Sequence, residues 1–153
     1  DADLLPCLNT LSKNLKLACH MFSEHDIQPV FEMINGTDMP RFLVQNIAQA
    51  QEMLEAVQHP ALKMQYDCYH MAMMGEDVLQ GLQENIQAIG HIQFADCPGR
   101  HEPDTAQIMY ANIFEWLQHS SYDGFIAAEY RPKTVSTQSF AWKAKYFAAH
   151  PQS

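Results

Sequence analysis

Short apolar segments alternate with longer amphipathic segments along this chain, and this alternation constrains the fold more than any other feature. Five segments repeat apolar residues every three or four positions, as helices do when one face packs on a sheet. They are residues 8–22, 43–57, 79–89, 110–117 and 140–147. Four segments between them are too short for helices and end in polar residues, at 29–35, 62–67, 91–96 and 124–130. We interpret these as strands, and the alternation predicts an α/β fold with parallel βα repeats.

The charge of the chain excludes several classes of partner. The 9 Lys and Arg residues and 18 Asp and Glu residues give a net charge of 9 − 18 = −9. Such a chain lacks the basic surface that binds nucleic acids or anionic membranes, so we expect neither partner. No segment approaches the roughly 18 apolar residues of a membrane span, and the first residues do not have the pattern of a secretory signal. We therefore expect a cytoplasmic protein.

The cysteines point to the same compartment. Cys7, Cys19, Cys68 and Cys97 form neither a CxxC pair nor a zinc-finger pattern. In a chain long enough to build a hydrophobic core, we expect all four to be reduced and buried.

An oxygen-bearing polar side chain stands in or near the C-terminal half of every predicted strand. These residues are Glu32, Asp67, Gln93 and Glu129, separated by 67 − 32 = 35, 93 − 67 = 26 and 129 − 93 = 36 positions. The carboxyl ends of parallel strands form one rim, where the active sites of α/β proteins lie. Carboxylate and amide oxygens suit Mg²⁺ or Mn²⁺ and accept Co²⁺ or Zn²⁺. The alternative is that each strand end is polar simply because the chain leaves the core there, and the pattern alone leaves both interpretations open.

Several stretches carry a more specific signal. They read Phe-Glu-Met-Ile-Asn at 31–35, Asp-Met-Pro at 38–40, Leu-Lys-Met-Gln-Tyr-Asp-Cys-Tyr-His at 62–70, Gly-His-Ile-Gln-Phe-Ala-Asp at 90–96, Pro-Gly-Arg-His-Glu-Pro at 98–103 and Gly-Phe-Ile-Ala-Ala-Glu-Tyr-Arg-Pro at 124–132. In order and spacing, over nearly the whole chain, they resemble the hydroxypyruvate isomerase family. That family belongs to the xylose isomerase-like TIM barrels, which also include sugar epimerases and 2-oxo-tetronate isomerases.

The resemblance implies roles for individual residues. It implies that a divalent metal, Mg²⁺ or Mn²⁺ before Co²⁺ or Zn²⁺, is ligated by Glu32, Asp67, Gln93 and Glu129. Glu32 and Glu129 would also be the catalytic pair that transfers a proton. The residues close to the substrate would be His70, Arg100 and His101, with His70 also open as a metal ligand or as a support for one. The implied reaction isomerises hydroxypyruvate to tartronate semialdehyde through an enediolate.

Other functions remain open at this point. A related isomerase or epimerase would act on another small hydroxy-keto acid, a 2-oxo-tetronate or a sugar. A non-catalytic half-barrel would bind a cation or a partner chain at its acidic rim and turn over nothing. The zinc endonucleases of the same superfamily are disfavoured, because they need to approach DNA and this chain carries a charge of −9 and a histidine-poor ligand set.

The chain departs from the family pattern in sequence and in length. Met33 follows the first ligand where the family has Pro, and residues 104–110 lack the two glycines and the acidic residue of the family's loop. A (β/α)₈ barrel takes about 250 residues, whereas this chain has 153 residues. We expect residues 1–153 to form a single partial TIM-barrel domain that lacks the N-terminal strands. Because four parallel strands leave two open edges, we expect a piece of a longer chain or a half-barrel that closes against another copy.

Overall fold

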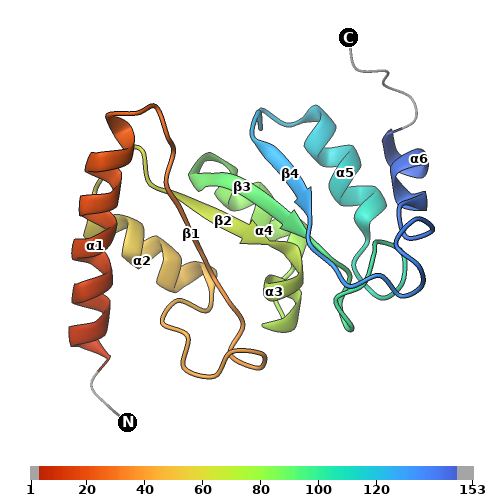
Figure 1. Ribbon diagram of the computed structural model, residues 1–153, viewed down its shortest axis with the longest axis horizontal. Coiled ribbons are helices and arrows are strands. Elements are labelled where there is room, and N and C mark those ends of the chain that lie inside the picture. Colours follow the sequence, from red (N-terminus) through yellow and green to blue (C-terminus); the bar gives the residue numbers. More distant parts are fainter. Residues whose placement is uncertain (1–3, 148–153) are drawn as a thin grey trace.

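A computed structural model gives the structure of the chain and describes residues 4–147. Its four strands form one parallel sheet in sequence order, β1-β2-β3-β4 (Figure 1). The strands are β1 (Val30–Glu32), β2 (Lys63–Asp67), β3 (Ile89–Phe94) and β4 (Phe125–Ala128). Each lies within or overlaps one of the predicted segments, so the parallel α/β sheet is confirmed.

Helices connect the strands and flank the sheet. They are α1 (Leu5–Ser23), α2 (Ile47–Val57), α3 (Cys68–Met73), α4 (Val78–Asn85), α5 (Tyr110–His119) and α6 (Ala141–Phe147), with one 3₁₀ turn at Ile86–Ala88. All five predicted helices are present with shifted ends, and α3 is additional. Helix α3 follows β2 directly and is largely buried, so it has no amphipathic stripe by which its sequence could reveal it.

Two helix ends differ from the sequence pattern for local reasons. Helix α2 begins at Ile47 because the side chain of Asn46 accepts a hydrogen bond from the Gln49 N–H at 2.9 Å, which caps the first turn. The predicted helix 79–89 ends at Asn85 instead, and Ile89 opens β3. The apolar stripe continued into the strand because Ile89 packs in the same core as α4.

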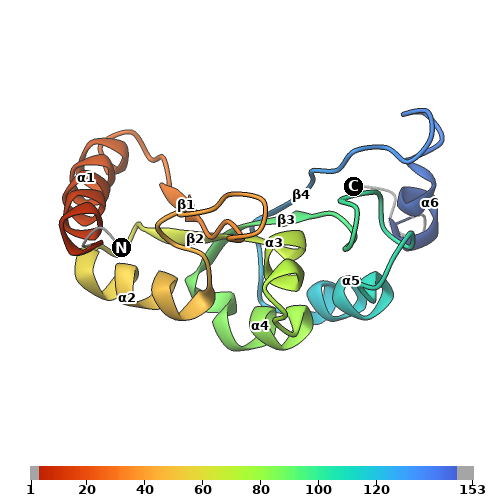
Figure 2. The same ribbon diagram turned by 90° about the horizontal axis from the view of Figure 1, so that it is seen from below.

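The sheet buries one face and leaves the other open. Figure 2 shows α2, α4 and α5 below the sheet, with α1 beside β1 and α6 beyond β4. Alternate side chains of β2 and β3 point to these helices and are buried, as a strand's period of two requires: Met64, Tyr66, Ile92 and Phe94. In the part of the chain that the structure describes, no helix lies on the opposite face.

The strands at the two ends of the sheet have one neighbour each among residues 4–147. At the start of the edge strand β4, Phe125 lies on the face of the sheet that no described helix covers, and it is 83% exposed. Cys19, Cys68 and Cys97 are buried free thiols, as predicted, whereas Cys7 is exposed on α1, so its predicted burial is wrong. None of the described helices is long and apolar enough to cross a membrane.

Candidate active site

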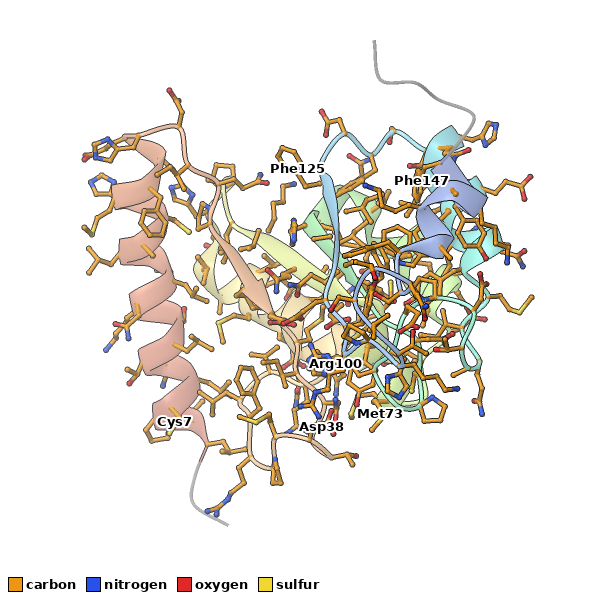
Figure 3. All side chains as sticks on the ribbon, turned by 45° about the vertical axis from the view of Figure 1, so that its right-hand side comes forward. Cys7, Asp38, Met73, Arg100, Phe125 and Phe147 are labelled. Carbon is orange, nitrogen blue, oxygen red and sulfur yellow. The ribbon has the colours of Figure 1, made fainter. Side chains whose placement is uncertain are left out.

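The predicted site residues meet at the carboxyl edge of the sheet. Glu32 and Asp67 are the last residues of β1 and β2, Gln93 is the last but one of β3, and Glu129 directly follows β4. The strand register places Asp67 beside Gln93 and Gln93 beside Ala127. In Figure 3, Arg100 and Asp38 lie at this end of the molecule, and Phe125 lies at the other end of β4.

Three side chains form a compact group at this edge. One ligand atom from each of Glu32, Asp67 and His70 lies within 4.8 Å of the others. The His70 Nε2 is 3.8 Å from Glu32 Oε1 and 3.7 Å from Asp67 Oδ2. Asp67 is 0% exposed, and its other oxygen caps α3 by accepting the Tyr69 N–H at 2.9 Å. Strand β2 and helix α3 thus position two of the three groups within four residues.

Burial disfavours the charged forms of Glu32, Asp67 and His70. Burial, followed by the negative charges of Asp67 and Glu129, raises the pKa of Glu32 to about 7. Burial also raises the pKa of Asp67 to about 6. The same effect, with the positive charge of Arg100, lowers the pKa of His70 to about 4 and keeps that ring neutral. Two ionised carboxylates this close need a compensating positive charge, and a divalent cation fits the donor set.

Arg100 supplies part of that charge. Its Nη2 lies 2.7 Å from Glu129 Oε2 and 3.2 Å from Asp67 Oδ2. Its guanidinium stacks over the Tyr69 ring, 4.9 Å from the ring centre. Glu129 therefore joins the group through Arg100 rather than through direct contact with Glu32 or His70.

Two further predicted residues lie at the border of the group. The Gln93 Oε1 accepts a hydrogen bond from the Gln65 side chain at 2.6 Å. The His101 Nδ1 lies 2.7 Å from the backbone oxygen of Arg131. A cavity of about 550 Å³ opens over the group and is lined by Glu32, Tyr69, His70, Arg100, Glu129 and Arg131, among others. Its volume lies within the range of small-molecule binding sites. Neither His101 nor Gln93 is among the residues that line it.

Sequence reasoning missed residues that hold the site in place. Asn35 contacts His70, and Asp38 accepts a hydrogen bond from the Tyr69 hydroxyl at 2.8 Å. Asp96 is 0% exposed, and its carboxylate accepts four backbone N–H groups at 2.8–2.9 Å, from Cys97, Thr105, Ala106 and Ile108. It thereby shapes the loop that carries Arg100 and His101. The sequence signal for Asp96 is an acidic residue between a strand and a Pro-Gly turn, at the end of the stretch 90–96 that resembles the family.

Fold and site together define a class. A parallel βα sheet with acidic side chains gathered at its carboxyl edge is the arrangement of barrel-type α/β enzymes. Residues 2–146 match the family model described as "Xylose isomerase-like TIM barrel". The chain belongs to this family, and its four parallel strands make up a partial barrel.

Two curated relatives within the family are similar in sequence to this chain. The chain is 36% identical over 146 residues to the 2-oxo-tetronate isomerase of Cupriavidus necator, covering 95% of this chain and 56% of the relative. It is 36% identical over 137 residues to the hydroxypyruvate isomerase of Escherichia coli, covering 90% and 53%. The chain thus spans about half the length of the curated relatives it matches.

Solved structures agree on the fold. A crystal structure from Brucella melitensis titled as an AP endonuclease of family 2 superimposes with a TM-score of 0.89 at 29% identity, over 94% of this chain and 56% of that one. The 3-keto-D-glucoside 4-epimerase of E. coli superimposes with a TM-score of 0.79 at 21% identity, over 94% and 55%. The second likeness concerns the fold alone.

Proposed function

We propose that this chain carries the metal-binding and proton-transfer residues of a sugar-acid isomerase, with hydroxypyruvate and tartronate semialdehyde as the reacting pair. The observation that carries the proposal is the group of Glu32, Asp67 and His70 under a cavity that Arg100 and Glu129 also line. Two relatives named as isomerases of small keto acids support the reaction class.

The donor set fits a divalent metal. The proposed ligands are Glu32, Asp67, Gln93 and Glu129, whose oxygens match the preference of Mg²⁺ and Mn²⁺. Burial, and to a smaller extent the neighbouring carboxylates, raise the pKa of Glu32 and Asp67, so a bound cation would stabilise their ionised forms. A bound cation would supply Lewis-acid stabilisation of negative charge on the substrate oxygens, worth several kcal/mol.

Two glutamates would move the proton. The C3–H of hydroxypyruvate is weakly acidic, and its removal leaves an enediolate. C2 then accepts a proton while the hydroxyl proton on O3 is transferred to O2, so that C3 becomes the aldehyde. Glu32 and Glu129 come from strands at the two ends of the sheet and both line the cavity. A pKa of about 7 suits Glu32 to either half of this transfer near neutral pH.

Cationic and neutral donors would hold the substrate. Arg100 suits a carboxylate because its guanidinium can donate two parallel hydrogen bonds. In the structure Arg100 pairs with Glu129 and Asp67, so a substrate carboxylate would compete with these side chains for the guanidinium. His70 is close enough to the cavity to donate to a substrate oxygen, and His101 would act through its contact with Arg131.

The alternative substrates are 2-oxo-tetronates, because a relative carries that name, and sugars, because the matching family model is described as xylose isomerase-like. We further propose that residues 1–153 act as one partial-barrel domain, completed either by further strands or by a second copy. An endonuclease function is disfavoured by the charge of −9, which repels a phosphate backbone.

Hydrogen exchange tests the proposal directly. Proton NMR would follow the C3 signal of hydroxypyruvate in D₂O with this chain, in Mg²⁺ and in EDTA. The proposal predicts that the C3 signal disappears only when both protein and Mg²⁺ are present, at a rate higher than in a protein-free control. A folded chain that catalyses no exchange on hydroxypyruvate, on a 2-oxo-tetronate or on a ketose would contradict it.

A further inference from the structure

Asn35 lies just beyond β1 and is 0% exposed. Its side-chain oxygen, Oδ1, accepts the backbone N–H groups of Thr37 at 3.1 Å and Asp38 at 2.8 Å. Because a backbone N–H can only donate, these two contacts fix which end of the amide is oxygen. The Nδ2 end is therefore the donor toward the site.

The Asn35 amide nitrogen uses both of its hydrogens. One goes to Asp38 Oδ2 at 3.0 Å and the other to His70 Nδ1 at 2.6 Å. The backbone N–H of Asn35 also points to His70 Nδ1, at 3.4 Å. Two donors converge on one ring nitrogen, so Nδ1 must be the unprotonated acceptor. In the neutral ring the proton is then on Nε2.

The Nε2–H faces the proposed reaction site. Its distances of 3.8 Å to Glu32 Oε1 and 3.7 Å to Asp67 Oδ2 are too long for hydrogen bonds, and His70 lines the cavity. A protonated nitrogen cannot ligate a metal, because ligation needs its lone pair. It can donate to an oxygen that enters the cavity.

We propose that Asn35 is a positioning residue that fixes His70 as the Nε2–H tautomer, so that His70 is a hydrogen-bond donor to substrate and not a metal ligand. The donor role rests on the proposed function; the tautomer does not. Asp38 anchors the arrangement, because its Oδ2 also accepts the Tyr69 hydroxyl at 2.8 Å and Tyr69 carries Arg100 on its ring face. The two side chains proposed to hold substrate, His70 and Arg100, are thus oriented by one buried network.

Nitrogen NMR of the imidazole rings tests the tautomer without any substrate. A long-range ¹H–¹⁵N spectrum of the metal-free chain in EDTA distinguishes a protonated Nε2 from a protonated Nδ1, and the His70→Gln spectrum assigns the His70 signals. We expect a single Nε2–H form in the wild type. In Asn35→Asp, whose carboxylate can only accept, we expect Nδ1 to become protonated. Asn14→Asp, at an exposed position on α1, is the matched control and should leave the His70 signals unchanged.

A metal titration tests the second half of the inference. His70→Gln should bind Mn²⁺ with the affinity of the wild type, whereas loss of a ligand would weaken binding by about tenfold or more. A wild-type Nδ1–H form, or a folded Asn35→Asp chain with unchanged His70 signals, would overturn the inference. If Asn35→Asp does not fold, the wild-type spectrum still decides the tautomer of His70, and Asn35→Ser, which removes the amide donor, tests the role of Asn35. Absence of hydroxypyruvate exchange would count against the proposed function and leave the tautomer result standing.

Discussion

Glu32 and Asp67 lie on the β1–β2 side of the candidate site, and Glu129 lies on the β4 side. The Asp67 side chain is 0% exposed and contacts α3 and Arg100, whereas the Glu129 side chain is 53% exposed and pairs with Arg100. Strand β2 has neighbours on both edges, whereas β1 and β4 have one neighbour each among residues 4–147. The difference between the two sides therefore lies in side-chain burial: Glu32 is 23% exposed and Asp67 0%, whereas the exposed Glu129 side chain is held by its ion pair with Arg100.

This difference shows which side chains the fold itself holds in position and which depend on a single ion pair. Burial holds Glu32, Asp67 and His70 at fixed mutual distances and shifts the pKa of each. The Glu129 backbone N–H donates to the Phe94 oxygen at 3.0 Å, but its side chain is held by a partly exposed ion pair, and such pairs contribute little to stability. The β1–β2 side should therefore dominate metal binding, and the β4 side should matter chiefly for turnover.

The largest effect is expected from Asp67→Asn. The variant removes a buried charge from the centre of the group while Asn still caps α3, so the fold should remain. We expect a fall in hydroxypyruvate exchange of about 1,000-fold, since both metal binding and charge stabilisation are lost. NMR exchange rates and circular dichroism would measure this. A folded variant with nearly normal exchange would mean that the β1–β2 side is not the centre of the site.

The next effect is that of Glu129→Gln. Removing one partner of the proton-transfer pair should lower exchange by about 100-fold or more, the usual worth of a positioned acid or base. Because the Glu129 side chain is exposed and its ion pair with Arg100 is partly exposed, the unfolding free energy should change little. Exchange rates and urea denaturation would be compared with the wild type. Full activity in the folded variant would remove Glu129 from the mechanism.

Asp96→Ala should affect stability and the loop together. The substitution leaves four backbone N–H groups without their carboxylate, at a cost of about 2 kcal/mol after partial hydration. We expect a lower urea midpoint and weaker substrate binding, because the loop carries Arg100. Asp123→Ala, at an exposed position before β4, is the control. Unchanged stability in Asp96→Ala would show that the loop does not need this anchor.

The pH dependence of metal binding should follow the raised carboxyl pKa values. Protons compete with the metal for Glu32 and Asp67, so the metal affinity should fall by about tenfold per pH unit or more below their pKa values of about 7 and 6.

The stability of the metal-free chain should depend on pH in the opposite direction. In the folded chain the pKa of Glu32 is raised from 4.5 to about 7 and that of Asp67 from 3.8 to about 6, so the folded state binds protons more tightly than the unfolded state. The unfolding free energy should therefore fall as the pH rises through this range. Titrations with Mn²⁺ and urea across this range measure both, and a metal affinity independent of pH would contradict the assignment.

The smallest effect is expected from Phe125→Ser. Phe125 is 83% exposed at the start of β4, so the isolated chain should lose less than about 0.5 kcal/mol. Ile126→Ser, on the same strand but packed against the core, should cost more and is the matched comparison. Equal losses in the two variants would mean that the open face of the sheet is covered in solution.

The sequence predicted what depends on local pattern. Apolar runs revealed the strands, and the polar residue at the end of each run pointed to Glu32, Asp67, Gln93 and Glu129. It did not reveal α3, because a short helix buried on most sides has no stripe. The family resemblance, rather than any spacing, pointed to His70 and Arg100.

The sequence pattern did not predict contacts between residues that are far apart along the chain. Asn35 and His70 are 35 positions apart and meet only because β1 and β2 are adjacent. The pairing of Arg100 with Glu129, 29 positions apart, likewise depends on how the loop after β3 folds back over the sheet edge. Both contacts change the chemistry, since one sets a tautomer and the other partly neutralises a proposed ligand.

Binding of Mn²⁺ tests the central claim most directly, because it needs neither substrate nor turnover. Electron paramagnetic resonance would follow free Mn²⁺ during titration of the wild type, Asp67→Asn and Glu129→Gln, with Mg²⁺ as competitor. The account predicts saturable binding that Mg²⁺ displaces, that is lost in Asp67→Asn and that is only weakened in Glu129→Gln. No saturable binding to the folded wild type, or equal binding in Asp67→Asn, would contradict it.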